Sequence, residues 1–194
     1  MSFARFASFA VLLAACTGLT TPPGAEHLGT YQMHAVPMFR ACALSDVAAN
    51  EFSFQATFSR DPNNEQAWVT LQQYSREATF DGQQLGSVAS APRSFSGVCS
   101  GCPMALRETI RVDLLSLSQN VAAGDRCPDG PVPAVDDDAG IHAPGPDAFG
   151  YDAVRACGAL LTETVVTDHL PDGGTCDATC GDCTVQYRLT GERR

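Results

Sequence analysis

The stretch FSFQATFSR, residues 52–60, indicates the fold class more clearly than any other part of the sequence. It alternates four apolar side chains with polar ones: Phe52, Phe54, Ala56 and Phe58. Successive side chains of a β-strand point to opposite faces, so this period of two predicts a strand with one buried face. The residues that follow, DPNN at 61–64, are types that turns favour.

The same period recurs outward from this stretch in both directions. Asp81-Gly82, inside the expected strand pair 77–88, is a strong signal for a β-hairpin. The other expected strands are residues 30–36, 66–74, 108–117, 159–167 and 184–190. Short helices or turns fit residues 37–49 and 151–157. The pattern predicts an all-β fold of about seven to eight strands, either an antiparallel β-sandwich or a barrel.

One long segment departs from this pattern. Residues 124–150 are rich in Pro, Gly and Asp and contain the acidic run Asp136, Asp137 and Asp138. Such a segment predicts a long surface loop, a place where proteins often bind partners. The run does not reproduce the alternating ligands and glycine of known calcium loops, so a solvated acidic loop is expected, with a calcium site as the alternative.

The beginning of the chain has the layout of an export signal. Arg5 precedes an apolar run from Phe6 to Leu13, and the small residues Ala14 and Ala15 follow. The run is much shorter than the roughly 20 residues that a membrane-spanning helix needs. We therefore expect residues 1–15 to act as a signal peptide.

The tetrapeptide Leu13-Ala14-Ala15-Cys16 resembles the lipobox of bacterial lipoproteins. The resemblance implies a diacylglycerol on the Cys16 sulfur, cleavage before that residue and acylation of the new amino terminus. Two or more acyl chains anchor a protein stably, whereas one does so only marginally. Thr17 stands where an aspartate commonly retains such proteins at the inner membrane, so the resemblance favours the outer membrane. An ordinary signal peptide with an incidental Cys16 is the alternative.

These features divide the chain into three parts. Residues 1–15 form the signal, and residues 16–28 form the lipidated cysteine and a tether rich in Thr, Pro and Gly. Residues 29–194 are expected to form a single β domain, with the loop at 124–150, and they are numerous enough to bury a core.

With Cys16 set aside, eight cysteines remain. They are Cys42, Cys99, Cys102, Cys127, Cys157, Cys176, Cys180 and Cys183. An even number in a chain expected to reach an oxidising compartment predicts disulfides, although eight cysteines allow roughly a hundred different pairings. The pair Cys127 and Cys157 is the one that we favour, because it would tie the ends of the loop-like segment between them.

Two C-x-x-C motifs, at 99–102 and 180–183, are also typical of zinc sites and of redox sites. A structural zinc site is usually built from two such pairs with about 12 to 20 residues between them, and these motifs lie much farther apart. A thioredoxin-like redox site needs a C-x-x-C at the start of a helix in an α/β pattern, which is absent here. Structural disulfides are therefore preferred over a metal site or redox catalysis.

Two wider resemblances concern the mature chain. The phrases FSFQATFSRD, SREATFDGQ, SAPRSF, YDAVRACG and YRLTGERR are similar to parts of uncharacterised, cysteine-rich envelope lipoproteins of myxobacteria-like organisms. That similarity implies an envelope location and carries no activity. The alternation of aromatic residues also resembles lipocalin-like barrels, although Tyr31 stands where their opening G-x-W motif has tryptophan.

The sequence offers no local catalytic motif. It lacks G-x-S-x-G, H-E-x-x-H, G-x-x-x-x-G-K and G-x-G-x-x-G, so no catalytic residue, cofactor or metal ligand is assigned. The four histidines are expected to be surface or structural residues: His27, His34, His142 and His169. A formal net charge of −10 speaks against nucleic acid as a partner.

Two hypotheses of function follow. The preferred one is a non-enzymatic envelope lipoprotein, held to the lipid bilayer by acylated Cys16. Its loops at 124–150 and 170–183 would bind a protein or a small molecule, or the domain would serve a structural role. The rival is an anchored hydrolase or metal-dependent enzyme, with His142, His169 and neighbouring aspartates as its site.

Overall fold

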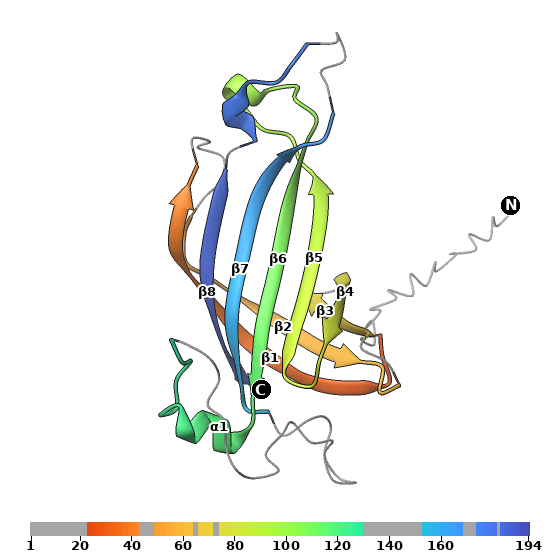
Figure 1. The fold of residues 1–194 in the computed structure, drawn as a ribbon, viewed down its shortest axis with the longest axis vertical. Coiled ribbons are helices and arrows are strands. Elements are labelled where there is room, and N and C mark those ends of the chain that lie inside the picture. The colour runs from red at the N-terminus through yellow and green to blue at the C-terminus, as the bar shows by residue number, and fades with distance from the viewer. Residues whose placement is uncertain are drawn as a thin grey trace, which may run out of the picture.

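The computed structural model describes residues 23–42, 49–63, 66–71, 74–129, 153–168, 174–181 and 183–194. Within these residues, eight antiparallel strands form a closed barrel in which each strand pairs with the next along the chain and β8 pairs with β1 (Figure 1). The expected all-β class is confirmed, and of its two alternatives the chain adopts the barrel.

The strands follow the predicted period closely in most places. Their bounds are β1 Glu26–Ala41, β2 Phe52–Arg60, β3 Gln66–Leu71, β4 Tyr74–Phe80, β5 Gln84–Pro92, β6 Met104–Leu115, β7 Arg155–Val166 and β8 Thr184–Arg193. β2 has the predicted bounds, whereas the single strand expected at 66–74 is two: β3 ends at Leu71 and β4 begins at Tyr74. Of the apolar residues in that stretch, Ala67, Trp68, Val69 and Leu71 lie in β3, and only Tyr74 lies in β4.

β1 is longer than its sequence pattern indicated. It pairs with β2 through residues 26–35 and with β8 through residues 31–41, so it closes the barrel by serving both neighbours. The helical turn expected from residue 37 is wrong for residues 37–41, because a register shift between Pro37 and Phe39 lets the proline stay in the strand. Residues 26–28, expected in the tether, also lie in β1.

The inward-facing side chains fill the barrel. Tyr31 and Phe58 are among the largest fully buried residues, and their ring centroids lie 5.4 Å apart. The Tyr31 hydroxyl lies 3.3 Å from the carbonyl oxygens of Leu28 and Ala153, so its polar atom is satisfied inside the core. An eight-stranded barrel has an interior just wide enough for side chains to fill, which agrees with this packed centre.

Short helices lie at the two ends of the long strands (Figure 1). They are η1 Gly97–Cys99, α1 Leu117–Ala122 and η2 Ala178–Cys180. α1 was not predicted, although Ser116 and Gln119 form a capping box that the sequence displays as S-x-x-Q. The helix or turn expected at 151–157 is wrong from Arg155 onward, where β7 begins. Among the described residues, no helix has the length and apolarity needed to cross a bilayer.

Candidate functional site

Four disulfides join the eight cysteines of the described residues. They are Cys42–Cys183, Cys99–Cys180, Cys102–Cys176 and Cys127–Cys157. The expected pairing of Cys127 with Cys157 is confirmed. Cys16, the expected lipidation site, lies outside the described residues.

Neither C-x-x-C motif closes on itself. Cys99 and Cys102 both reach the segment that carries η2, where they bond Cys180 and Cys176, and Cys183 bonds Cys42 at the end of β1. A dithiol redox site would pair the two cysteines of one motif. The redox alternative is therefore contradicted, and these cysteines act as crosslinks.

The crosslinked segments form a cap at one end of the barrel. Cys99 and Cys180 are fully buried, and the inward-facing Thr164 of β7 lies beneath them. The Thr164 hydroxyl donates to the carbonyl oxygen of Cys180 at 2.9 Å and accepts from the Cys183 N–H at 3.3 Å. The cap is thus bonded to the barrel wall through a polar side chain as well as through sulfur.

The histidines do not form a site in the described part of the chain. His27 lies near Thr30, and His34 is exposed beside Ser53 and Glu51. His142, His169 and the acidic run at 136–138 lie outside the described residues. Within the described residues, no group of three or more His, Cys, Asp or Glu side chains is placed to hold a metal ion.

The loops expected to carry specificity are described only in part, at 124–129, 174–181 and 183. Cys127 and Asp129 lie against the outer face of the barrel, where Asp129 pairs with Arg188. A pocket of about 490 Å³ adjoins them, and the exposed Met38 and Phe39 contribute to its lining.

A larger pocket lies in the barrel wall itself, where β4 and β5 separate. The ladder between these strands consists of two residue pairs, Thr79 with Gly86 and Phe80 with Leu85. β4 continues along β3 as far as Tyr74, and β5 continues along β6 as far as Pro92. We call this opening the seam, and it is the place where the wall is held together by the fewest paired residues.

The backbone of β5 presents unpaired groups to the seam. The Arg93 N–H donates to Met104 and the Leu114 N–H donates to Gln83, so the odd-numbered residues of β5 bond to β6. Backbone groups alternate in direction along an antiparallel strand. Val88 and Ser90 therefore direct their N–H and C=O groups toward β4, beyond the last ladder pair.

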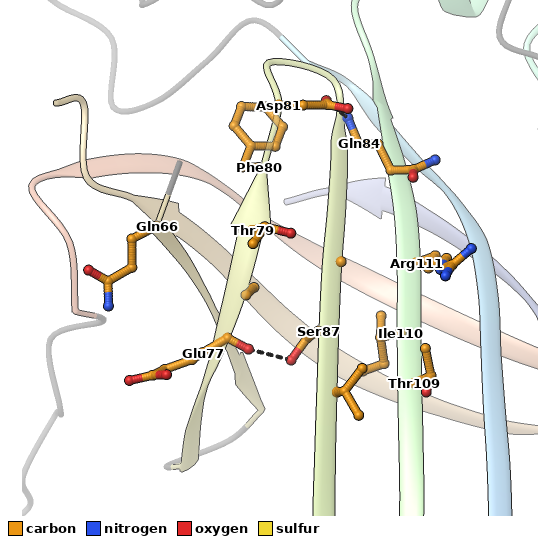
Figure 2. Close-up of a pocket in the computed structure, with 13 residues that line it drawn as sticks. Gln66, Glu77, Thr79, Phe80, Asp81, Gln84, Ser87, Thr109, Ile110 and Arg111 are labelled. Atoms are coloured by element: carbon orange, nitrogen blue, oxygen red, sulfur yellow. Dashed lines mark hydrogen bonds between the residues drawn. The ribbon is translucent and has the colours of Figure 1, made fainter. Parts of the chain in front are cut away.

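The backbone of β4 meets the same opening from the other side. Because Thr79 pairs with Gly86, the alternation along β4 directs the backbone groups of Glu77 and Ser75 into the seam. One of them is satisfied by a side chain, since the Ser87 hydroxyl donates to the Glu77 carbonyl oxygen at 2.6 Å (Figure 2). A single side-chain bond thus replaces the backbone ladder at this level.

The pocket at the seam has a volume of about 870 Å³, and we call it the seam groove. Its lining is drawn from β3 to β6: Gln66, Glu77, Ala78, Thr79, Phe80, Asp81, Gln84, Gly86, Ser87, Val88, Thr109, Ile110 and Arg111 (Figure 2). Val88 is 64% exposed, whereas the inward-facing Phe80 and Ile110 are buried and form its floor. The groove therefore opens on the outer face of the barrel.

The seam groove is lined by charged and hydroxyl side chains. It offers the carboxylates of Glu77 and Asp81, the guanidinium of Arg111 and the hydroxyls of Thr79 and Thr109. Its lining contains no histidine or cysteine, and the Ser87 hydroxyl already bonds a backbone oxygen. These groups can donate and accept hydrogen bonds to a polar ligand.

A second pocket extends the seam toward the cap. It has a volume of about 410 Å³ and is lined by residues 89–92 of β5 and the following Arg93, together with Tyr74 and Leu106. Arg76 of β4 and Glu108 of β6 contact each other here at 2.6 Å, across the inner face of β5. Both side chains are about one-quarter exposed, so this pair lies across the inner side of the seam while it stays partly in contact with solvent.

The sequence did not indicate the seam groove. The segment 77–88 predicts a continuous hairpin, and the hairpin forms, since the Asp81 side chain accepts from the N–H groups of Gln83 and Gln84. Comparison with protein-family models, with curated proteins and with solved structures yields no match to this chain.

Proposed function

We propose that the chain is a cell-envelope lipoprotein whose barrel is a non-enzymatic binding module. Acylated Cys16 anchors it in a lipid bilayer, with the outer membrane favoured, and the partner binds at the seam groove. The observation that carries the proposal is the two-pair ladder between β4 and β5, the shortest ladder between neighbouring strands of the described barrel, which leaves a polar groove in the wall.

The disulfides support the envelope location. Crosslinks persist in oxidising compartments and are rare in the cytosol, and here they join all eight cysteines of the described residues. The lipobox-like tetrapeptide ending at Cys16 fits the same compartment, because the lipoprotein pathway delivers its products across the inner membrane.

The binding role is supported by the character of the seam groove. Ligand sites combine apolar floor residues with a few convergent polar groups. Phe80 and Ile110 supply the buried floor, and Glu77, Thr109 and Arg111 supply the polar groups. Exposed strand edges are ready templates for pairing with another chain, so an open seam is a suitable place for a partner to bind.

Metabolic labelling with a clickable fatty acid tests the anchor. Wild-type protein should incorporate the label, Cys16→Ser should not, and the neighbouring Thr17→Ser variant should label as the wild type does. Equal incorporation in wild type and Cys16→Ser would overturn the lipoprotein assignment.

Site-specific photo-crosslinking in cells tests the seam groove. A benzophenone amino acid replaces Val88 in the groove or, as the control, Val121 on α1, and the two native side chains are 64% and 60% exposed. An adduct of defined mass from position 88 alone supports binding at the groove. Adducts from both positions, or from neither, contradict it.

A further inference from the structure

We infer that the occupant of the seam is an extended segment of a partner protein, which adds to β5 as an extra strand. This inference rests on the proposed function of the seam groove and specifies the chemistry of its ligand. Strand addition joins an extended peptide to an exposed sheet edge through main-chain hydrogen bonds, while flanking pockets select its side chains.

The edge of β5 provides the main-chain groups for this pairing. Val88 and Ser90 direct an N–H and a C=O each toward the seam, and no ladder pair joins either residue to β4, which contacts β5 at this level through the bond from Ser87 to the Glu77 carbonyl oxygen. Gly86 is still paired with Thr79, and Pro92 has no N–H and ends the strand, so the usable edge runs from Val88 to Ala91. At a rise of roughly 3.3 Å per residue, a segment of about four to six residues covers this edge.

The two pockets of the seam flank the same edge. The larger pocket adjoins β5 from Gln84 to Val88, and the smaller one adjoins it from Ala89 to its end at Pro92. Side chains of an added strand would alternate between the outer face and the inner face of the seam. On the inner face the Arg76–Glu108 pair limits the depth to which those side chains reach.

The charges around the edge indicate which segment fits. Glu77 lies on the β4 side of the seam groove and has no ion-pair partner among the described residues. Arg111 lies on the β6 side beside Gly86 and is likewise without one in the described part of the chain. A segment with a basic side chain toward Glu77 and an acidic one toward Arg111 satisfies both.

A second copy of this chain is a poorer occupant than a separate partner. The chain has a formal net charge of −10, so two copies repel each other when their walls approach. Pairing two β5 edges would also bring two copies of Glu77 toward one opening. We therefore assign the seam to a different protein, with a basic residue in its extended segment.

Peptide selection with a backbone-specific control tests the inference. Heptapeptides displayed on phage are selected against the full chain in mild detergent, and the most enriched one is synthesised with a fluorophore for anisotropy. Val88→Pro removes the N–H that faces the seam and leaves the N–H groups of the β6 ladder in place, because that ladder uses the odd-numbered residues. Val88→Thr is the matched control, which keeps that N–H and a β-branched side chain.

We expect Val88→Pro to weaken peptide binding about tenfold or more, the loss of at least one main-chain hydrogen bond, while Val88→Thr stays within about twofold of the wild type. A peptide that is N-methylated at alternate residues should lose binding in one of the two alternations. This second measurement uses the wild-type protein, and Ser90→Pro provides another edge variant if Val88→Pro does not fold.

Three results would overturn the inference: no enriched peptide, equal binding by Val88→Pro and wild type, or full binding by both N-methylated peptides. Concentration-dependent dimers in sedimentation that Val88→Pro abolishes would instead assign the seam to a second copy. Failure here with a retained Val88 crosslink in cells means that the seam groove binds another class of ligand. Failure of both experiments removes the proposed binding role as well.

Discussion

Gly158 illustrates how tightly single residues are fixed in this barrel wall. A Cβ at this position would lie 1.9 Å from the carbonyl oxygen of Arg111 on β6, an obstacle that only backbone movement relieves. We expect Gly158→Ala to lower the free energy of unfolding by about 3 kcal/mol, the upper part of the range for overpacking. Urea unfolding measures this change.

Gly86 is the matched control for that substitution. It is also a strand glycine of the wall, but the nearest atom to its Cβ would be Thr79 Oγ1 at 3.6 Å, an ordinary contact. Gly86→Ala should change the free energy of unfolding by less than about 0.5 kcal/mol. Equal effects at the two positions would contradict the close approach of β6 and β7 at Gly158.

Ionisation of Tyr187 is expected to lower the stability of the barrel at high pH. Burial raises the pKa of its phenol above the ordinary value of 10.0, and the nearby Arg40 partly opposes that shift. Since the unfolded chain releases this proton first, the stabilising effect is complete below pH 10 and is lost as the pH rises through the folded-state pKa.

The measurement is the free energy of unfolding at several pH values between about 9 and 11, a range that brackets the ordinary pKa of a tyrosine phenol. Wild type should lose stability across this range, and Tyr187→Phe should lose less, because it has no proton to release at that position. If the free energy of unfolding depended on pH identically in the two proteins, Tyr187 would have the same pKa in the folded and the unfolded chain.

Residue patterns predicted part of this structure. The alternation of apolar and polar residues in 52–60 identified β2, because that signal is local in sequence. The even number of cysteines after Cys16 predicted that all of them form disulfides, because an even count allows complete pairing. The role of Gly158 could not be predicted, since it depends on how closely a strand distant in sequence approaches. The same holds for Thr164, whose bonds to the cap depend on the disulfides.

At the scale of elements, the seam predicts different rates of amide exchange for neighbouring residues of β5. The N–H groups of Ser87 and Ala89 face β6 and belong to its ladder, whereas those of Val88 and Ser90 face the seam. In the free protein we expect the latter two amides to exchange with deuterium at least about tenfold faster than the former two. Amide exchange followed by nuclear magnetic resonance resolves all four.

The corresponding pair on β8 provides the internal control. Gln186 and Arg188 lie in a strand that is paired on both sides, with β1 and with β7, so neighbouring amides there should differ little. If the amides of β5 were equally protected from exchange, the ladder with β4 would continue along the strand. The seam would then not exist in solution.

The hairpin at 77–88 marks the limit of prediction for elements. Asp81-Gly82 predicted the turn correctly, because turn chemistry is local. The early end of the ladder at Thr79 and Gly86 depends on the paths that β3 and β6 impose on the two strands from either side. The split of 66–74 into β3 and β4 was missed for the same reason: a pattern of apolar residues does not specify where a short strand reverses.

At the scale of the molecule, two of the crosslinks act on the same connection. Cys99–Cys180 and Cys102–Cys176 both join the η1 segment to the η2 segment, with sequence separations of 81 and 74 residues. When one is present, the other closes only a small additional ring. In the loop-entropy account, removing either one costs roughly 2 to 3 kcal/mol.

Removing both opens the large loop and should cost about 2 kcal/mol more than the sum of the single effects. Three variants test this: a Cys-to-Ser pair at 99 and 180, a pair at 102 and 176, and all four together. Denaturant unfolding measures each. Strict additivity would indicate that the two crosslinks stabilise separate parts of the cap.

The Cys42–Cys183 bond determines what a single proteolytic cut can release from this chain. Residues 43–182 all lie inside the covalent ring that this bond closes. A protease that cuts once anywhere in that ring makes two chain ends but releases no fragment. The two pieces stay joined through Cys42–Cys183, and through any other disulfide that spans the cut, until these bonds are reduced. Cleavage of the chain and release of a fragment are therefore separate events, and the second one requires a reductant.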